Sequence, residues 1–138
     1  MEWLAGMRMT AERLNDNTAD EETTAGLTVA TGWSLNGFQG RKVNGITTVY
    51  VSLNRTGATV TTTSAGALSA GPQLVCTLPI GWRPPDTIIE NFDKSGTADG
   101  GVSILATGTC TIQSMSPTAS ITLNQDITFF SQWISEND

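Results

Sequence analysis

The sequence is dominated by short runs in which apolar residues alternate with Thr or Ser, each closed by turn-forming residues. Beyond the first 26 residues these runs recur about every 8 to 15 residues, close to the spacing typical of antiparallel sheets. In the clearest run, ITTVYVSLN (46–54), Val49, Val51 and Leu53 are predicted to face one way and Tyr50 the other. We therefore expect an all-β fold, an antiparallel β-sandwich or jelly roll.

Turn and connector segments separate the expected strands. In the run 32–40, the glycine at position 37 interrupts the alternation and predicts a β-bulge. The segments SAGALSAGP (64–72) and KSGTADGG (94–101) are expected to be a connector and a turn. The predicted strands are 27–30, 32–40, 46–54, 58–63, 72–80, 85–93, 101–113 and 119–135, the last as one long or two short strands.

The first 25 residues have a different character. They carry six of the 13 acidic residues and one helical stripe of apolar side chains. A helix this short is unstable alone in water, so we expect it to pack on copies of itself or on a partner. Residues 1–25 are thus predicted to be an assembly or attachment segment and 26–138 the β-domain, so deletion of residues 1–17 should break assembly or attachment and spare the β-fold. The stripe consists of Leu4, Met7, Ala11 and Leu14.

Charge and hydropathy exclude two classes of partner. With seven basic residues and a net charge of −6, the chain lacks the basic patch of a nucleic-acid-binding protein. No apolar run is long enough to cross a membrane, and the amino-terminal residues lack a signal-peptide pattern, so we expect folding in a cytoplasm without membrane insertion. Cys76 and Cys110 lie in strand-like runs, and buried free thiols are favoured over a disulfide.

The residue types that enzymes need are sparse. Histidine is absent, which removes Ser-His-Asp and Cys-His catalysis and the commonest metal ligand. Asp93 and Asp99 flank the 94–101 turn, and solvated turn acids are favoured over a catalytic pair. We expect no enzyme activity, no catalytic residues, no cofactor and no metal.

Aromatic residues are the remaining candidates for a binding site. Each can stack on a sugar ring, although core packing is the commoner role for any one of them. Polar loops around 37–45, 54–57 and 93–101 offer further contacts. The tentative ligand-binding residues are Trp33, Tyr50, Asn54, Arg55, Asp93 and Lys94.

The stretch TLPIGWRPP (77–85) predicts a rigid corner at the end of a strand. Pro79 cannot donate to a sheet, and Gly81 permits a positive φ. Trp82 is expected to fold over the corner and Arg83 to bind free carbonyls, so both should be buried or half-buried. The predicted structural corner comprises Leu78, Pro79, Gly81, Trp82, Arg83 and Pro84.

This corner resembles the LP-x-G-aromatic-RP corner of small tail-fibre and minor tail proteins of tailed bacteriophages. The opening GMRMTAERLN (6–15) is similar to the short helical opening of the same proteins. The resemblance implies a virion protein on the tail or capsid surface, assembled in the bacterial cytoplasm. It also implies a homotrimer whose amino-terminal helices cluster on the three-fold axis or dock on other virion proteins.

Two functions fit this resemblance. The first is receptor binding during host attachment, with the β-domain recognising a saccharide of the host cell wall. The alternative is a capsid decoration or head-fibre protein with a structural role and no ligand. An aromatic-and-amide cleft would favour the first, and an apolar amino-terminal anchor exposed on one side would favour the second.

Overall fold

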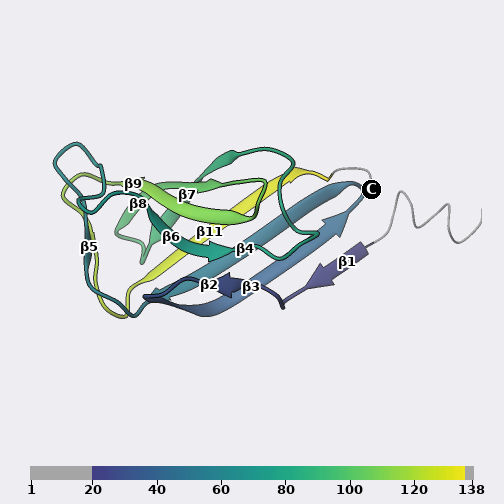
Figure 1. Ribbon diagram of the computed structural model, residues 1–138, viewed down its shortest axis with the longest axis horizontal. Helices are drawn as coiled ribbons and strands as arrows, with labels where there is room; N and C mark the ends of the chain where they lie inside the picture. The colour runs from purple at the N-terminus through teal and green to yellow at the C-terminus, as the bar shows by residue number, and fades with distance from the viewer. Residues whose placement is uncertain (1–19, 136–138) are drawn as a thin grey trace, which may run out of the picture.

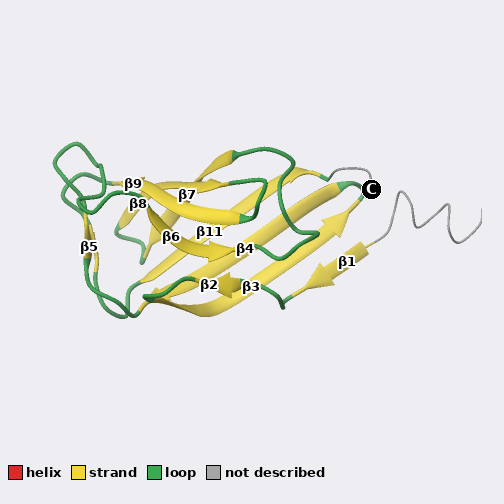
Figure 2. Ribbon diagram, in the orientation of Figure 1, coloured by secondary structure: helices red, strands yellow, loops and turns green. Residues whose placement is uncertain are grey.

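The computed structural model describes residues 20–135, which form eleven β-strands and no helix (Figures 1 and 2). The all-β antiparallel expectation is confirmed. The predicted helical stripe at Leu4, Met7, Ala11 and Leu14 lies outside the described residues. The strands are β1 (Asp20–Thr23), β2 (Thr28–Val29), β3 (Trp33–Val43), β4 (Ile46–Arg55), β5 (Val60–Thr61), β6 (Gln73–Thr77), β7 (Ile88–Lys94), β8 (Ala98–Ile104), β9 (Thr109–Met115), β10 (Ser120–Ile121) and β11 (Asp126–Ile134).

Nine of these strands form one curled antiparallel sheet in the order β1-β3-β4-β11-β7-β8-β9-β6-β2. The remaining two, β5 and β10, pair with each other. The sheet curls so far that β2, at one end of this order, contacts β3 near the other. The core therefore lies inside a single rolled sheet. β1 lies in the predicted amino-terminal segment and nevertheless joins this sheet, paired with β3.

Two predicted strands are each divided by a tight turn. The run 101–113 was expected to be one strand, but it contributes to β8 and β9, because the chain reverses at Leu105–Gly108. The N–H of Gly108 donates to the Leu105 carbonyl at 2.8 Å and closes this turn. β8 also begins at Ala98, inside the segment predicted to be a turn. The run 119–135 forms two strands, β10 and β11.

The β3–β4 hairpin shows how local sequence sets the register. Its turn residues Asn44 and Gly45 have φ values of 52° and 79°, the left-handed pair that a two-residue hairpin turn requires. The predicted bulge is confirmed, because the pairing shifts between Leu35 and Gly37. Beyond the bulge, Phe38 pairs with Val51 and is buried in the core.

The inner face of the sheet carries the core. Val49, Val51 and Leu53 are fully buried, whereas Tyr50 is 41% exposed, as the alternation predicted. Cys76 and Cys110 are buried free thiols, which confirms the prediction, and they stand opposite each other on β6 and β9.

The corner residues lie in the connection from β6 to β7. Gly81 has a φ of 90°, and the Nε of Arg83 donates to the Leu78 carbonyl at 2.8 Å, both as predicted. Trp82 and Arg83 are half-buried, also as predicted. Trp82 also packs on Gly40 of β3, so this connection covers part of one end of the rolled sheet.

Candidate functional site

The structure distributes the six tentative ligand-binding residues over two sides of the sheet. Tyr50, Asn54 and Asp93 are outside the core, with Asp93 opposite Thr128 of β11. Trp33, Arg55 and Lys94 are each no more than 7% exposed. The set therefore does not form one site.

Trp33 and Arg55 form a structural pair. The guanidinium carbon of Arg55 lies 4.8 Å from the centroid of the Trp33 ring, and its Nε donates to the Ala58 carbonyl at 2.8 Å. Burial lowers the pKa of Arg55 from its ordinary value. Arg55 serves the fold by tying the loop after β4 to the core.

The three predicted contact loops do not form one cluster. The loops at 54–57 and 93–101 both contact the segment before β11, because the N–H of Arg55 donates to the Gln125 carbonyl and the N–H of Ser95 to the Asp126 carbonyl. The loop at 37–45 ends at the Asn44–Gly45 turn, at the opposite end of the sheet. There the N–H of Ser135 donates to the Gly45 carbonyl at 2.7 Å.

The outer face of β4 and β11 carries an ordered ladder of cross-strand pairs. From the hairpin end, an apolar pair is followed by a polar pair, an aromatic pair, a hydroxyl pair and an amide–carboxylate pair. Side chains on one face of an antiparallel sheet contact their cross-strand partners directly. The pairs are Ile46–Ile134, Thr48–Gln132, Tyr50–Phe130, Ser52–Thr128 and Asn54–Asp126.

The aromatic pair is the centre of this ladder. Tyr50 and Phe130 are 41% and 54% exposed. Gln39 stands opposite Tyr50 on β3, and the Nε2 of Gln132 donates to Thr48 Oγ1 at 2.9 Å. Ring faces bordered by amides suit a sugar, whose apolar face stacks on the rings while its hydroxyls hydrogen-bond to the amides.

Beyond the hydroxyl pair, the carboxylate of Asp126 accepts hydrogen bonds from two side-chain amides. Asp126 Oδ1 accepts hydrogen bonds from Asn54 Nδ2 at 2.8 Å and from Asn36 Nδ2 at 2.9 Å. The bulge between Leu35 and Gly37 places Asn36 at this position. Of the predicted residues, Tyr50 and Asn54 thus belong to this outer face.

Phe130, Gln132 and Asp126 were not predicted as site residues. The sequence signal was the alternation in DITFFSQWI (126–134), in which Phe129 is buried and Phe130 is exposed. The alternation does not show which strand lies beside this run, because strand pairing depends on the tertiary structure.

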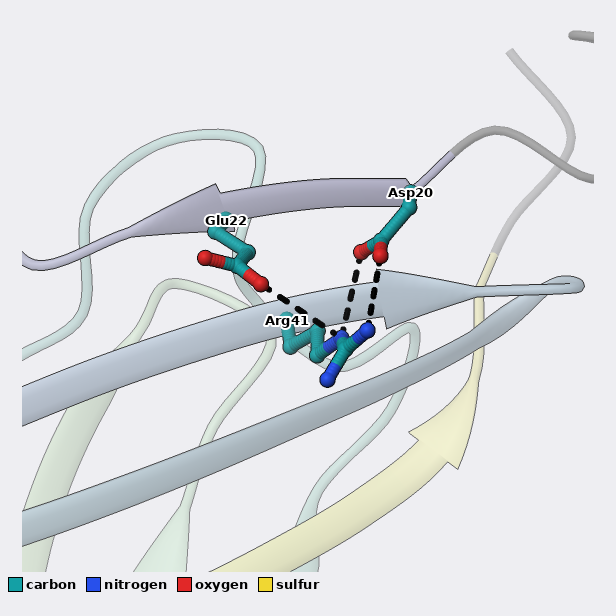
Figure 3. Close-up of polar contacts among 3 residues, drawn as sticks. All are labelled: Asp20, Glu22 and Arg41. Atoms are coloured by element: carbon teal, nitrogen blue, oxygen red, sulfur yellow. Dashed lines mark hydrogen bonds and ion pairs between the residues drawn. The ribbon is translucent and has the colours of Figure 1, made fainter.

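At the edge of the sheet, one cation holds the acidic strand β1. Arg41 contacts Asp20 through two hydrogen bonds, Nε–Oδ1 at 3.1 Å and Nη2–Oδ2 at 2.7 Å, and Glu22 at 3.7 Å (Figure 3). The hydrogen bond from Arg41 lowers the pKa of Asp20. The contacts of Arg41 with Asp20 and Glu22 are the ion pairs found among residues 20–135.

A pocket of about 410 Å³ opens at the end of the rolled sheet that carries the β3–β4 turn. It lies between the ends of β3, β4 and β11, the β6–β7 connection and the β8–β9 turn. Among residues 20–135, no acidic side chain lines it. Its lining residues are Lys42, Thr47, Ile80, Gly81, Arg83, Pro84, Pro85, Ala106, Trp133 and Ser135.

Within residues 20–135 there is no group of three or more metal-ligating side chains. That part of the chain also contains no helix with the length and apolar character needed to span a bilayer.

A scan of the chain against protein-family models finds no match, and a search of curated protein sequences finds none either.

Proposed function

We propose that this chain is a non-enzymatic virion protein of a tailed bacteriophage, of the tail-fibre or minor tail type. Its β-domain binds a saccharide of the host cell surface on the outer face of β4 and β11. The observation that carries the proposal is the exposed Tyr50–Phe130 pair bordered by Gln39 and Gln132.

The geometry of this face suits a sugar chain better than a buried small molecule. The ladder consists of successive pairs along two neighbouring strands, so its side chains form an elongated surface. An extended saccharide lying along it would meet the rings of Tyr50 and Phe130 first and the amides of Asn36 and Asn54 further on. Tyrosine and phenylalanine lose little conformational entropy on binding, since each has two side-chain torsions.

Binding is tested with the full chain on an array of bacterial cell-wall polysaccharides and neutral oligosaccharides. We expect the double variant Tyr50→Ala/Phe130→Ala to lose binding while remaining folded, because neither side chain belongs to the buried core. The matched control is Ile89→Ala/Leu123→Ala, which removes two side chains that are 64% and 59% exposed elsewhere on the surface. Loss of binding in the control, or retention in the aromatic variant, would overturn the proposal.

The proposed assembly is a homotrimer organised by residues 1–25, which also contact other virion proteins. Light scattering should give a mass of about 44 kDa, three times the 14.6 kDa of the chain. Replacing Leu4 and Leu14 by Asp should release monomers, because it charges the predicted helical stripe. A monomeric full chain would overturn the trimer and leave saccharide binding to be decided by the array.

The second candidate is a capsid decoration or head-fibre protein without a ligand, and the position of β1 favours it. β1 is the outermost strand at one end of the sheet order, and its free edge has no strand partner among the described residues. This edge directly follows residues 1–19, so a partner could add a strand beside Asp20–Thr23. Capsid binding that is lost on Glu21→Pro, together with no signal on the polysaccharide array, would support this candidate over receptor binding.

A further inference from the structure

The pocket at the hairpin end is the mouth of the sheet's interior. Lys42 pairs with Thr47, and Thr47 pairs with Trp133. These three residues form an inward-facing row, two positions beyond the row of the buried core residue Val49. The β6–β7 connection, with Arg83, covers the other side of the row.

Two cations line this pocket, and neither has an acidic partner among residues 20–135. The ζ-ammonium of Lys42 lies 4.7 Å from the centroid of the Trp82 ring. The Nε of Arg83 is bonded to the Leu78 carbonyl at 2.8 Å, which fixes the guanidinium plane. Glu21 is the cross-strand neighbour of Lys42 on β1, but it forms no ion pair with Lys42 and does not line the pocket.

The remaining polar groups of the pocket include hydroxyls. Thr47 Oγ1 and Ser135 Oγ hydrogen-bond to each other. Because only one hydroxyl donates in such a pair, the other retains its proton for a third group. The pocket thus combines an ammonium, a guanidinium and a free O–H donor, with no carboxylate among the lining residues.

We propose that this pocket binds a small oxyanion, either a carboxylate or a phosphate group, between Lys42 and Arg83. Ammonium and guanidinium groups make their strongest hydrogen bonds to such oxyanions. The pocket volume of about 410 Å³ lies in the lower part of the range for small-molecule sites, so it suits one acidic sugar or one phosphate ester. The site is separate from the outer-face ladder and does not depend on saccharide binding there.

The test is a titration of the full chain, followed by amide NMR shifts, with three probes. Glucuronate supplies a carboxylate, glycerol phosphate supplies a phosphate, and glucose is the neutral control. We expect at least one anion to shift the amides of Lys42, Arg83 and Ala106, more weakly at high salt, and glucose to shift none. The anion that binds more tightly identifies the source of the oxyanion.

Lys42→Gln should weaken binding about tenfold or more, the usual effect of losing one charge-assisted hydrogen bond. The matched control is Arg41→Gln, which removes the same charge from the neighbouring residue on the opposite face of β3 and should change the affinity less than about twofold. Ala106→Glu gives a second test at an exposed position, where the fold is unaffected and the added carboxylate should repel either anion.

Three results would overturn the proposal. The first is no shift with either anion at millimolar concentration in a folded protein. The second is an equal loss of affinity in Lys42→Gln and Arg41→Gln, which would indicate non-specific charge attraction. The third is binding that is seen only in Glu136→Gln/Asp138→Asn, since the acidic residues that follow Ser135 would then be the occupant.

Discussion

Gly40 of β3 lies directly against the indole ring of Trp82, which comes from the β6–β7 connection. A β-carbon on Gly40 would stand 2.7 Å from Cε3 of Trp82 and 3.1 Å from the γ-methyl group of Thr23. Only glycine permits this approach, and the approach is what allows the connection to cover part of this end of the sheet.

Gly40→Ala should therefore destabilise the protein by about 1–3 kcal/mol, the usual effect of overpacking a tight contact. The measurement is the free energy of unfolding in urea. In a chain that already carries Trp82→Ala, the same substitution at position 40 should cost little more, because the clashing ring is gone. The control is Gly37→Ala, where an added β-carbon meets nothing within 4 Å. Equal losses at positions 40 and 37 would contradict this contact.

The contact with Gly40 makes Trp82 a structural residue. Trp82→Ala alone should lower the unfolding free energy, because removal of this half-buried ring exposes Gly40 and the side chain of Lys42. If Trp82→Ala left stability unchanged but abolished a binding activity, the corner would be a binding element and not a structural one.

The Asp20–Arg41 pair should respond to acid. The pKa of Asp20 is lowered below its ordinary value of 3.8, first by the hydrogen bond from Arg41. Because the pKa is lower in the folded chain, ionised Asp20 supports the β1–β3 pairing at neutral pH, and this support is lost as the pH falls through the lowered pKa. Carboxyl NMR should place the titration midpoint below 3.8 and move it upward in Arg41→Gln. An unchanged titration midpoint in Arg41→Gln would exclude Arg41 as the cause of the lowered pKa of Asp20.

Ser131 faces the core opposite Val49, and its hydroxyl has no hydrogen-bond partner among the described residues. Burying an unpaired hydroxyl costs about 1–3 kcal/mol, so Ser131→Ala should leave the unfolding free energy unchanged or raise it. The control is Ser103→Ala. Ser103 is also buried, but it accepts a hydrogen bond from Gln113 Nε2 at 3.0 Å, so its loss should cost about 1 kcal/mol. A larger loss at 131 than at 103 would show that the Ser131 hydroxyl is paired in solution.

The thiols of Cys76 and Cys110 should be unreactive in the native protein. A hydrogen bond with Cys110 and burial both raise the pKa of the Cys76 thiol, which keeps it from forming the reactive thiolate. With a disulfide reagent at pH 8, we expect no reaction of the folded chain and two equivalents of thiol after unfolding in denaturant. Cys76→Ala should reduce the second value to one. Rapid reaction in native buffer would contradict the burial of this pair.

Several features of this fold were predicted from local sequence, because their causes are local. A period of two set the inward and outward faces of β4, so Val49 and Tyr50 could be assigned before any partner strand was known. Gly81 predicted the corner conformation through its own backbone preference, and Arg83 reached a carbonyl only five residues away. The interruption at Gly37 predicted the bulge for the same reason.

The site depended on relationships that no local pattern contains. Tyr50 pairs with Phe130, Lys42 lines the same pocket as Arg83, and Gly40 packs on Trp82 only because the sheet curls and β11 inserts between β4 and β7. The order of strands distant in sequence is decided by which arrangement buries the most apolar surface, and that is a property of the whole chain. The sequence by itself therefore determined the all-β character, the buried face of β4 and the rigid corner, because their causes are local. The tertiary structure decided which exposed side chains became neighbours.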